Sequence, residues 1–192
     1  MNRLRVNALL IIAALFAADR ASKLWIESHL TLYDSYAVIP GIFNIVHTQN
    51  PGAAFGLFAT ASPTIRFLVL IAASLAMMAI LGQMLWQATQ KISAASATLR
   101  LALTLVLGGA IGNLYDRLLF DRVTDFVQVF LGNYEWPSFN VADSAICVGA
   151  TLLAVDLLRG RRPQPATVTT SIFIAWFLLS LASATVQNLN VS

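Results

Sequence analysis

Long uncharged stretches recur along the chain and predict membrane-spanning helices. Residues 67–90 and 101–115 carry no charged side chain, and another apolar run lies between Asp143 and Asp156. A helix rises 1.5 Å per residue, so about 20 residues cross the apolar core of a bilayer, and shorter runs must continue into flanking polar residues. The predicted spans are 6–27, 67–87, 99–116 and 140–158.

The two ends of the chain carry further apolar segments. Arg3 and Arg5 precede an apolar run that ends in small residues, which also resembles a cleaved signal peptide. Cleavage would discard a helix that leads into polar residues, so we favour a first span. At the other end, residues 161–192 comprise a basic linker and an apolar segment, and 167–186 predicts a fifth, C-terminal transmembrane helix.

Two connecting segments are longer than the predicted spans require. Residues 32–39 and 42–47 are β-rich and flank Pro40-Gly41, which predicts a hairpin within 31–48. Residues 119–139 combine aromatic and aliphatic side chains with few charges, a composition that suits the headgroup layer. We therefore expect an all-α integral membrane protein, with a four-helix transmembrane core and a small β-rich element.

Composition places the chain in a bilayer. The 192 residues are 58% hydrophobic and 11% charged, whereas about a quarter of the residues in a soluble domain are charged. A soluble globular enzyme is therefore excluded. The net charge is +3, but Lys and Arg lie in short clusters that cannot follow a phosphate backbone, so no nucleic-acid partner is expected. With one cysteine and two scattered histidines, we expect no metal site and no cofactor.

The distribution of charge orients the predicted spans. With the N-terminus in the cytoplasm, seven of the twelve basic residues lie on that side: Arg3, Arg5, Lys91, Arg100, Arg159, Arg161 and Arg162. This slight excess agrees with the positive-inside rule. Every acidic residue except Asp156 then lies on the outer side or at an outer helix end. Polar chemistry is therefore expected at the outer membrane face.

Two polar clusters lie near the first predicted span. Asp19 and Lys23 are four residues apart with the acid first, the favourable order for an ion pair on a helix. The pair could end the span at the interface or support a site. Asn50 and Gly52 lie in a run of small residues that lets the backbone approach another segment closely. An ordinary turn before the second span explains that run equally well.

A third cluster lies where the third predicted span leaves the membrane. Gly108 and Gly112, with Gly109 between them, form a step that lets two helices pack backbone to backbone. Three polar residues follow on one helix face: Asn113, Asp116 and Arg117. Helix packing explains the glycines but does not explain why three polar side chains share a direction.

The fourth cluster suggests a pair of carboxylates. Asn140 and Asp143 lie one helical turn apart at the outer end of the fourth span, and Asp125 lies in the segment before it. Each acid alone is more often a helix cap or an interfacial charge. If the segment folds back, Asp125 and Asp143 face each other. Two adjoining carboxylates share one proton and can drive water onto a peptide carbonyl without a metal.

The same residues are compatible with functions other than peptide hydrolysis. A small membrane transporter or ion-path component could use buried charges, but a path needs polar groups through the membrane depth, and Asp156 is far from the outer acids. A non-catalytic membrane scaffold is a third class. Ser22 and Lys23 are adjacent, about 100° apart on a helix, and so cannot form a Ser/Lys catalytic pair.

From about residue 6 to 159 the chain resembles the bacterial lipoprotein signal peptidase (signal peptidase II) family. Five motifs match in the family's order: Asp19-Arg20-x-x-Lys23, Asn50-x-Gly52-Ala53-Ala54-Phe55, Gly108-Gly109-x-x-Gly112-Asn113-x-x-Asp116-Arg117, Val123-x-Asp125-Phe126 and Phe139-Asn140-x-Ala142-Asp143-Ser144. The resemblance implies a membrane aspartic peptidase domain over 1–160. It also implies a periplasmic β-cradle at 31–48 and a lid-like loop at 119–139. The family usually ends soon after the fourth span, so the segment after residue 160 is a departure from it.

The resemblance also assigns roles to residues. Asp125 and Asp143 would be the catalytic pair. The supporting and substrate-contacting residues would be Asp19, Lys23, Asn50, Gly52, Gly109, Asn113, Arg117 and Asn140. The implied partners are membrane lipids and a prolipoprotein whose cysteine carries a diacylglyceryl group, cleaved just before that cysteine. The implied location is the bacterial inner membrane, with the site near the outer face.

Overall fold

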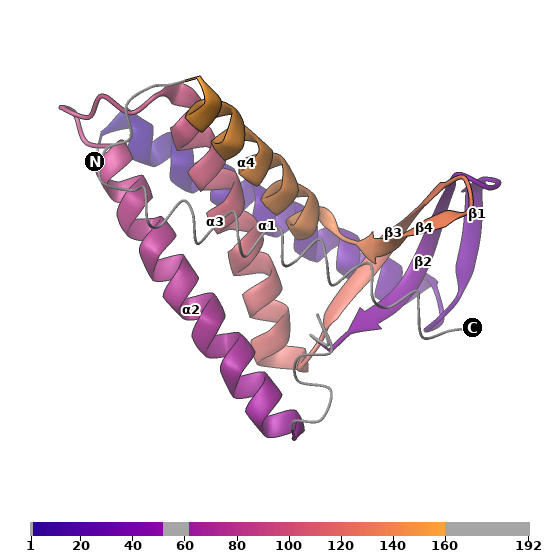
Figure 1. The fold of residues 1–192 in the computed structure, drawn as a ribbon. Helices are drawn as coiled ribbons and strands as arrows, with labels where there is room; N and C mark the ends of the chain where they lie inside the picture. Colours follow the sequence, from indigo (N-terminus) through magenta and orange to yellow (C-terminus); the bar gives the residue numbers. More distant parts are fainter. Residues whose placement is uncertain (1, 52–61, 160–192) are drawn as a thin grey trace.

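The computed structural model describes residues 2–51 and 62–159, which form a mostly helical chain with one antiparallel sheet (Figure 1). In chain order the elements are α1 (Arg3–His29), β1 (Ser35–Ile39), β2 (Phe43–Asn50), α2 (Pro63–Ala88), α3 (Ala97–Phe120), β3 (Val123–Leu131), β4 (Tyr134–Phe139) and α4 (Val141–Leu158). Gly52 and the predicted fifth helix at 167–186 lie outside the described residues.

Each helix begins where a polar side chain caps its first turn. The capping residues are Asn2, Ser62, Ser96 and Asn140. Each accepts a hydrogen bond from a backbone N–H that has no partner within the helix. Within the described residues three helices are long and apolar enough to cross a membrane: Phe67–Ala88, Ala97–Phe120 and Val141–Leu158. α1 is not among them, because Asp19, Arg20 and Lys23 interrupt its apolar run.

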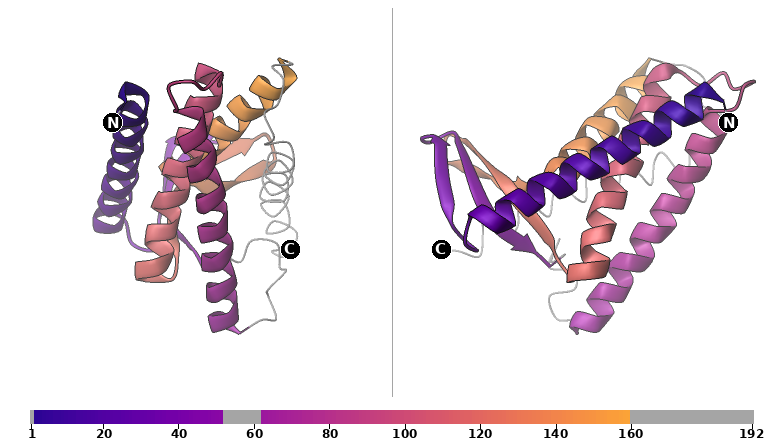
Figure 2. Two further views of the ribbon diagram at one scale, coloured as in Figure 1. Left: turned by 90° about the vertical axis from the view of Figure 1, so that its left-hand side faces the viewer. Right: turned by 180° about the vertical axis from the view of Figure 1, so that it is seen from behind.

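α3 lies at the centre of the helical part and packs against α4, α1 and α2 (Figures 1 and 2). Glycines permit the closest approaches. A Cβ at Gly109 would overlap the carbonyl oxygen of Ala142 on α4, and one at Gly112 would lie 2.9 Å from Asp19 Oδ2 on α1. Gly109 therefore lets the backbones of α3 and α4 approach closely, and Gly112 leaves room for the Asp19 side chain, so these glycines bring the C-terminal half of α1 and the start of α4 together.

The sheet lies beyond the C-terminal end of α1, at the opposite end of that helix from the N-terminus (Figures 1 and 2). Its strand order is β1-β2-β3-β4, and every neighbouring pair is antiparallel. The predicted hairpin around Pro40-Gly41 is present as β1 and β2, and Gly41 adopts a φ of 77° in its turn.

The segment predicted as a lid-like loop, 119–139, is largely regular secondary structure. This segment instead holds the end of α3 and the hairpin of β3 and β4. Gly132, with a φ of 64°, closes the hairpin turn, a conformation that glycine adopts without strain. β3 then pairs with β2 and joins both hairpins into one sheet. The described residues are therefore mostly helical with a four-stranded sheet, instead of all-α with one small β-rich element. The larger sheet was not predicted because β2 and β3 are distant in the sequence.

Candidate active site

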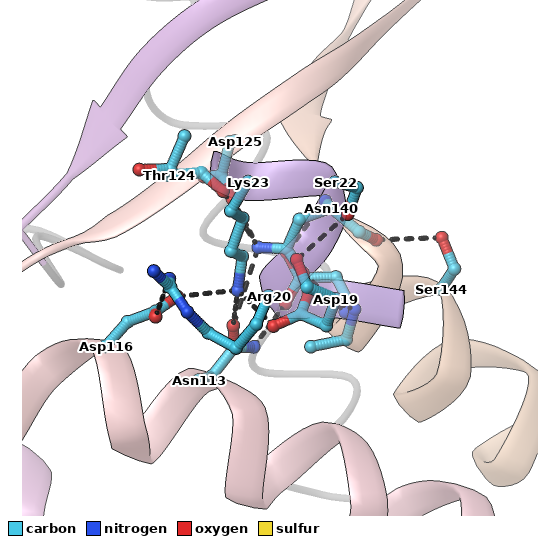
Figure 3. A network of polar contacts seen from close by, with 12 residues as sticks. Asp19, Arg20, Ser22, Lys23, Asn113, Asp116, Thr124, Asp125, Asn140 and Ser144 are labelled. Atoms are coloured by element: carbon cyan, nitrogen blue, oxygen red, sulfur yellow. Dashed lines mark hydrogen bonds and ion pairs between the residues drawn. The ribbon is translucent and has the colours of Figure 1, made fainter. Parts of the chain in front are cut away.

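The two predicted carboxylates lie on different elements, and Asn140 is hydrogen-bonded to both residues. Figure 3 shows Asn140 beside Asp125. Asp125 is on β3, and Asp143 is in the first turn of α4. The Asn140 side chain donates from Nδ2 to Asp125 Oδ1 at 2.7 Å. Its Oδ1 accepts from the backbone N of Asp143 at 2.9 Å. Asn140 therefore holds the first turn of α4 and the Asp125 carboxylate in one network.

The start of α4 is a capping box. While the Asn140 side chain accepts from the Asp143 backbone, Asp143 Oδ2 accepts from the Asn140 backbone N at 3.3 Å. This reciprocal pattern satisfies two helix-end donors and fixes the rotamers of both side chains. Asn140 is completely buried, so protein groups surround its amide. The orientation of Asp143 therefore follows from the local helix start.

Asn113 on α3 links Asp143 to a buried ammonium group. Asn113 Nδ2 donates to Asp143 Oδ1 at 2.7 Å, and Asn113 Oδ1 accepts from Lys23 Nζ at 3.4 Å. The predicted ion pair is confirmed, because Lys23 Nζ lies 2.6 Å from Asp19 Oδ2. Asp19 also reaches α4 and accepts from the Ala142 backbone N at 3.0 Å. These polar side chains thus bind α1, α3 and α4 together.

Two further charges complete this buried cluster. Asp116 Oδ2 lies 2.6 Å from Lys23 Nζ, and Asp116 Oδ1 lies 2.7 Å from Arg20 Nη1. Two cations and two carboxylates therefore sit in contact, with no net charge. Such pairing is what allows ionised groups to remain buried, because each partner offsets the other's loss of hydration.

The surroundings of Asp125 favour its protonated form. Burial, and after it the charge of Asp143, raises the pKa of Asp125 well above its usual value. Hydrogen bonds from Asn140 and Asn50 and the charge of Lys23 act in the opposite direction. A buried carboxyl beside a second carboxylate holds its proton at pH values where an exposed aspartate is ionised. A carboxyl group that keeps its proton can act as a proton donor, and once ionised it can accept a proton.

The remaining predicted site residues surround this network in different ways. Asn50 ends β2, where it pairs with Val123 and hydrogen-bonds Asp125 through its side chain. Gly109 lies against Ala142 and lets α4 approach α3. Arg117 interacts with the charges of Asp143 and Asp125, and its buried Nε has no hydrogen-bond partner among the described residues. Gly52 lies outside the described residues.

Several contacts of this site were not predicted from the sequence. Asp116 and Arg20 belong to the family motifs, but the contact between them was not predicted. The i, i+3 spacing of Asn113 and Asp116 did indicate that both side chains lie on one helix face, where both contact Lys23. Two threonines also hold the backbone around Asp125. Thr48 Oγ1 donates to the Asp125 carbonyl, and the Thr124 carbonyl accepts from Asn140 Nδ2. No sequence pattern pointed to either threonine, because both contacts depend on how the strands pair.

The fold is that of a membrane enzyme. Two solved structures described as bacterial membrane enzymes are similar to it. One has a TM-score of 0.68 at 26% identity, covering 82% of this chain and 93% of that chain. The other has a TM-score of 0.66 at 28% identity, covering 79% and 92%. Together with the three apolar helices, this likeness identifies a membrane protein.

Sequence comparison identifies the family. Residues 11–159 match the family model described as signal peptidase (SPase) II. A protein named lipoprotein signal peptidase from Solibacter usitatus is 43% identical over 88% of this chain and 100% of its own length. A protein of the same name from Pseudomonas aeruginosa is 38% identical over 84% of this chain and 94% of its own. The chain belongs to the signal peptidase II family, and it is therefore a membrane peptidase.

Proposed function

We propose that this protein is a membrane aspartic endopeptidase that removes the signal peptide from diacylglyceryl-modified prolipoproteins, just before the lipidated cysteine. Membership of the signal peptidase II family supports the substrate class. The observation that carries the aspartic mechanism is the Asn140 side chain, which is bonded to Asp125 and to the backbone of Asp143. One residue thereby relates the two carboxylates that the reaction needs.

In this mechanism the pair holds one proton, and we place it on Asp125 because its pKa is raised by burial and by Asp143. Asp143 is the ionised member, stabilised by donors on Asn113 and on the Asn140 backbone. Asp143 takes a proton from water as the water oxygen bonds to the scissile carbonyl carbon. Asp125 gives its proton to the carbonyl oxygen, which forms a neutral tetrahedral diol.

The second half of the cycle restores both groups. Asp143 transfers its new proton to the amide nitrogen as the C–N bond breaks, and Asp125 removes a proton from a diol hydroxyl. The products are the carboxyl end of the signal peptide and the free amino group of the lipidated cysteine. Both carboxyl groups return to their starting protonation states, and the reaction uses no metal and no covalent acyl-enzyme.

The surrounding residues form the supporting shell of the proposal. Asp19 and Lys23 place α1 beside the site, which supports a four-helix transmembrane core with α1 as its first span. The buried Nε of Arg117 has no hydrogen-bond partner within residues 2–51 and 62–159 and interacts with the charges of both carboxylates, which supports a contact with the substrate peptide. The charge distribution supports an inner-membrane location with the site at the outer face and membrane lipids around the helices.

A transporter or ion path is the less favoured alternative. The Asp125 network gathers at the end of α1 that meets the sheet, instead of being spread along the spans. Asp156, the acid near the far end of α4, bonds Ser96 and takes no part in the contacts around Asp125 among the described residues. Membership of the signal peptidase II family also favours a peptidase over a transporter.

The test is cleavage of a diacylglyceryl-modified prolipoprotein by the purified full chain in lipid. We expect conversion by the wild type and essentially none by Asp125→Asn or Asp143→Asn. Asp121→Asn is the matched control, because Asp121 is an exposed carboxylate in the left-handed cap of α3, a conformation that asparagine also adopts. Turnover by both pair variants equal to the control would contradict the assignment.

A further inference from the structure

One face of α1 carries three charged side chains at intervals of four residues: Asp19, Lys23 and Glu27. At 3.6 residues per turn they lie one above another along the helix. Asp19 bonds the Ala142 backbone on α4, and Lys23 contacts α3. Glu27 reaches β3, where its Oε1 accepts from Thr124 Oγ1 at 2.7 Å. One helix face thus contacts α3, α4 and β3, which carry Asn113, Asp143 and Asp125.

Thr124 is the residue immediately before Asp125, and it is buried. Its carbonyl oxygen accepts from Asn140 Nδ2 at 3.4 Å, and the same amide donates to Asp125 Oδ1 at 2.7 Å (Figure 3). On the other side, Thr48 Oγ1 donates to the Asp125 carbonyl at 3.1 Å. The start of β3 is therefore held by α1 through Glu27, by β2 through Thr48 and by the cap of α4.

We propose that Glu27 is a positioning residue for Asp125 and that it acts through Thr124. This inference rests on the proposed peptidase function. Glu27 is exposed, and among the described residues its side chain is hydrogen-bonded to Thr124 alone. Losing it removes the side-chain link between α1 and the start of β3. Because a displacement of about 1 Å at a reacting group can cost a hundredfold in rate, a small shift of Asp125 is sufficient to slow cleavage.

The experiment measures cleavage of a diacylglyceryl-modified prolipopeptide by the full chain in lipid nanodiscs. For Glu27→Ala we expect kcat to fall about tenfold with KM within about twofold of the wild type, because positioning affects the reaction step and not binding. Glu27→Gln keeps an acceptor oxygen and should recover most of kcat. Ser28→Ala is the matched control, because this neighbouring exposed side chain bonds only Trp25 and His29 among the described residues.

A double-mutant cycle tests the route. Thr124→Val removes the donor, so Glu27→Ala should reduce kcat no further in that background. If the fold-losses in kcat of the two single variants multiplied in the double variant, the proposal would be overturned. A Glu27→Ala variant with raised KM at unchanged kcat, or with the same kcat as Ser28→Ala, would also overturn it.

Hydrogen exchange separates this proposal from the proposed function. Backbone amides at the start of β3 should exchange faster in Glu27→Ala than in Ser28→Ala, whether or not any substrate is present. Equal exchange in the two variants would overturn the role of Glu27. Failure of the wild type to cleave the lipidated substrate would contradict the proposed function, and the exchange result would still decide whether Glu27 holds β3.

Discussion

Asp19 Oδ1 accepts a hydrogen bond from the backbone N of Ala142 at 3.0 Å, which joins positions 123 residues apart in the chain. Ala142 lies in the first turn of α4, where backbone N–H groups lack partners within the helix and a negative charge is favoured. The other oxygen of the same carboxylate pairs with Lys23. Asp19 therefore anchors the start of the helix that carries Asp143.

Removing the buried ammonium should destabilise the protein strongly. Lys23→Met leaves Asp19 without its cation, and a broken buried pair typically costs about 3–5 kcal/mol. We expect a clear fall in the midpoint of thermal unfolding in detergent. The double variant Lys23→Met with Asp19→Asn should recover part of the loss, because asparagine Oδ1 can still accept from Ala142. No recovery would mean that the charge pair is not what stabilises this region.

Asn140 variants should separate helix capping from catalysis. Asn140→Ser keeps a capping oxygen at the start of α4 but lacks the amide that reaches Asp125. Its unfolding midpoint should lie closer to the wild type than that of Asn140→Ala, which loses about 1 kcal/mol of capping in addition. Both variants should lose most of the cleavage activity. An active Asn140→Ser enzyme would show that the bond to Asp125 is dispensable.

A pair of glycines tests the close approach of α3 to α4. Gly109→Ala places a methyl group against the Ala142 carbonyl, so α4 must shift, and we expect lower stability and lower activity. Gly82→Ala is the control, because a Cβ there meets nothing within 4 Å and alanine favours a helix by about 1 kcal/mol over glycine. Its unfolding midpoint should stay level or rise. Equal behaviour of the two variants would contradict the packing role of Gly109.

The raised pKa of Asp125 predicts how activity depends on pH. Above that pKa the carboxyl ionises, the pair loses its shared proton and cleavage should fall, which gives the basic limb of the pH profile. Initial rates of cleavage measured across pH, at saturating and at low substrate, test this limb. A rate that rises steadily into the alkaline range would contradict a protonated Asp125.

The same pKa predicts a trend in stability. Because Asp125 holds its proton more tightly in the folded protein, the free energy of unfolding should fall as pH rises. The fall begins at the unfolded pKa of about 3.9 and ends at the raised folded pKa. Asp125→Asn cannot ionise and should lack that loss. Thermal unfolding of both proteins across this range should therefore show the variant gaining relative to the wild type as pH increases. Parallel curves would contradict the raised pKa.

Local patterns along the chain were enough to predict the helices and several residues of the candidate site. Apolar runs bounded by Ser96 and Asn140 define α3 and α4, since helix formation depends on local periodicity and caps. The Asp19–Lys23 pair was predictable for the same reason, because both residues lie on one helix four positions apart. The ordered motifs indicated the family, which the comparison with known proteins then established.

Local patterns did not reveal which distant groups come into contact. The pairing of β3 with β2, the second carboxylate on Lys23 from Asp116, and the bond of Glu27 to Thr124 all join separate elements. Each contact depends on helix crossing and strand register, which are set by the packing of the whole chain and leave no local periodicity to read. For that reason the sequence did not predict the hairpin of β3 and β4 that precedes α4.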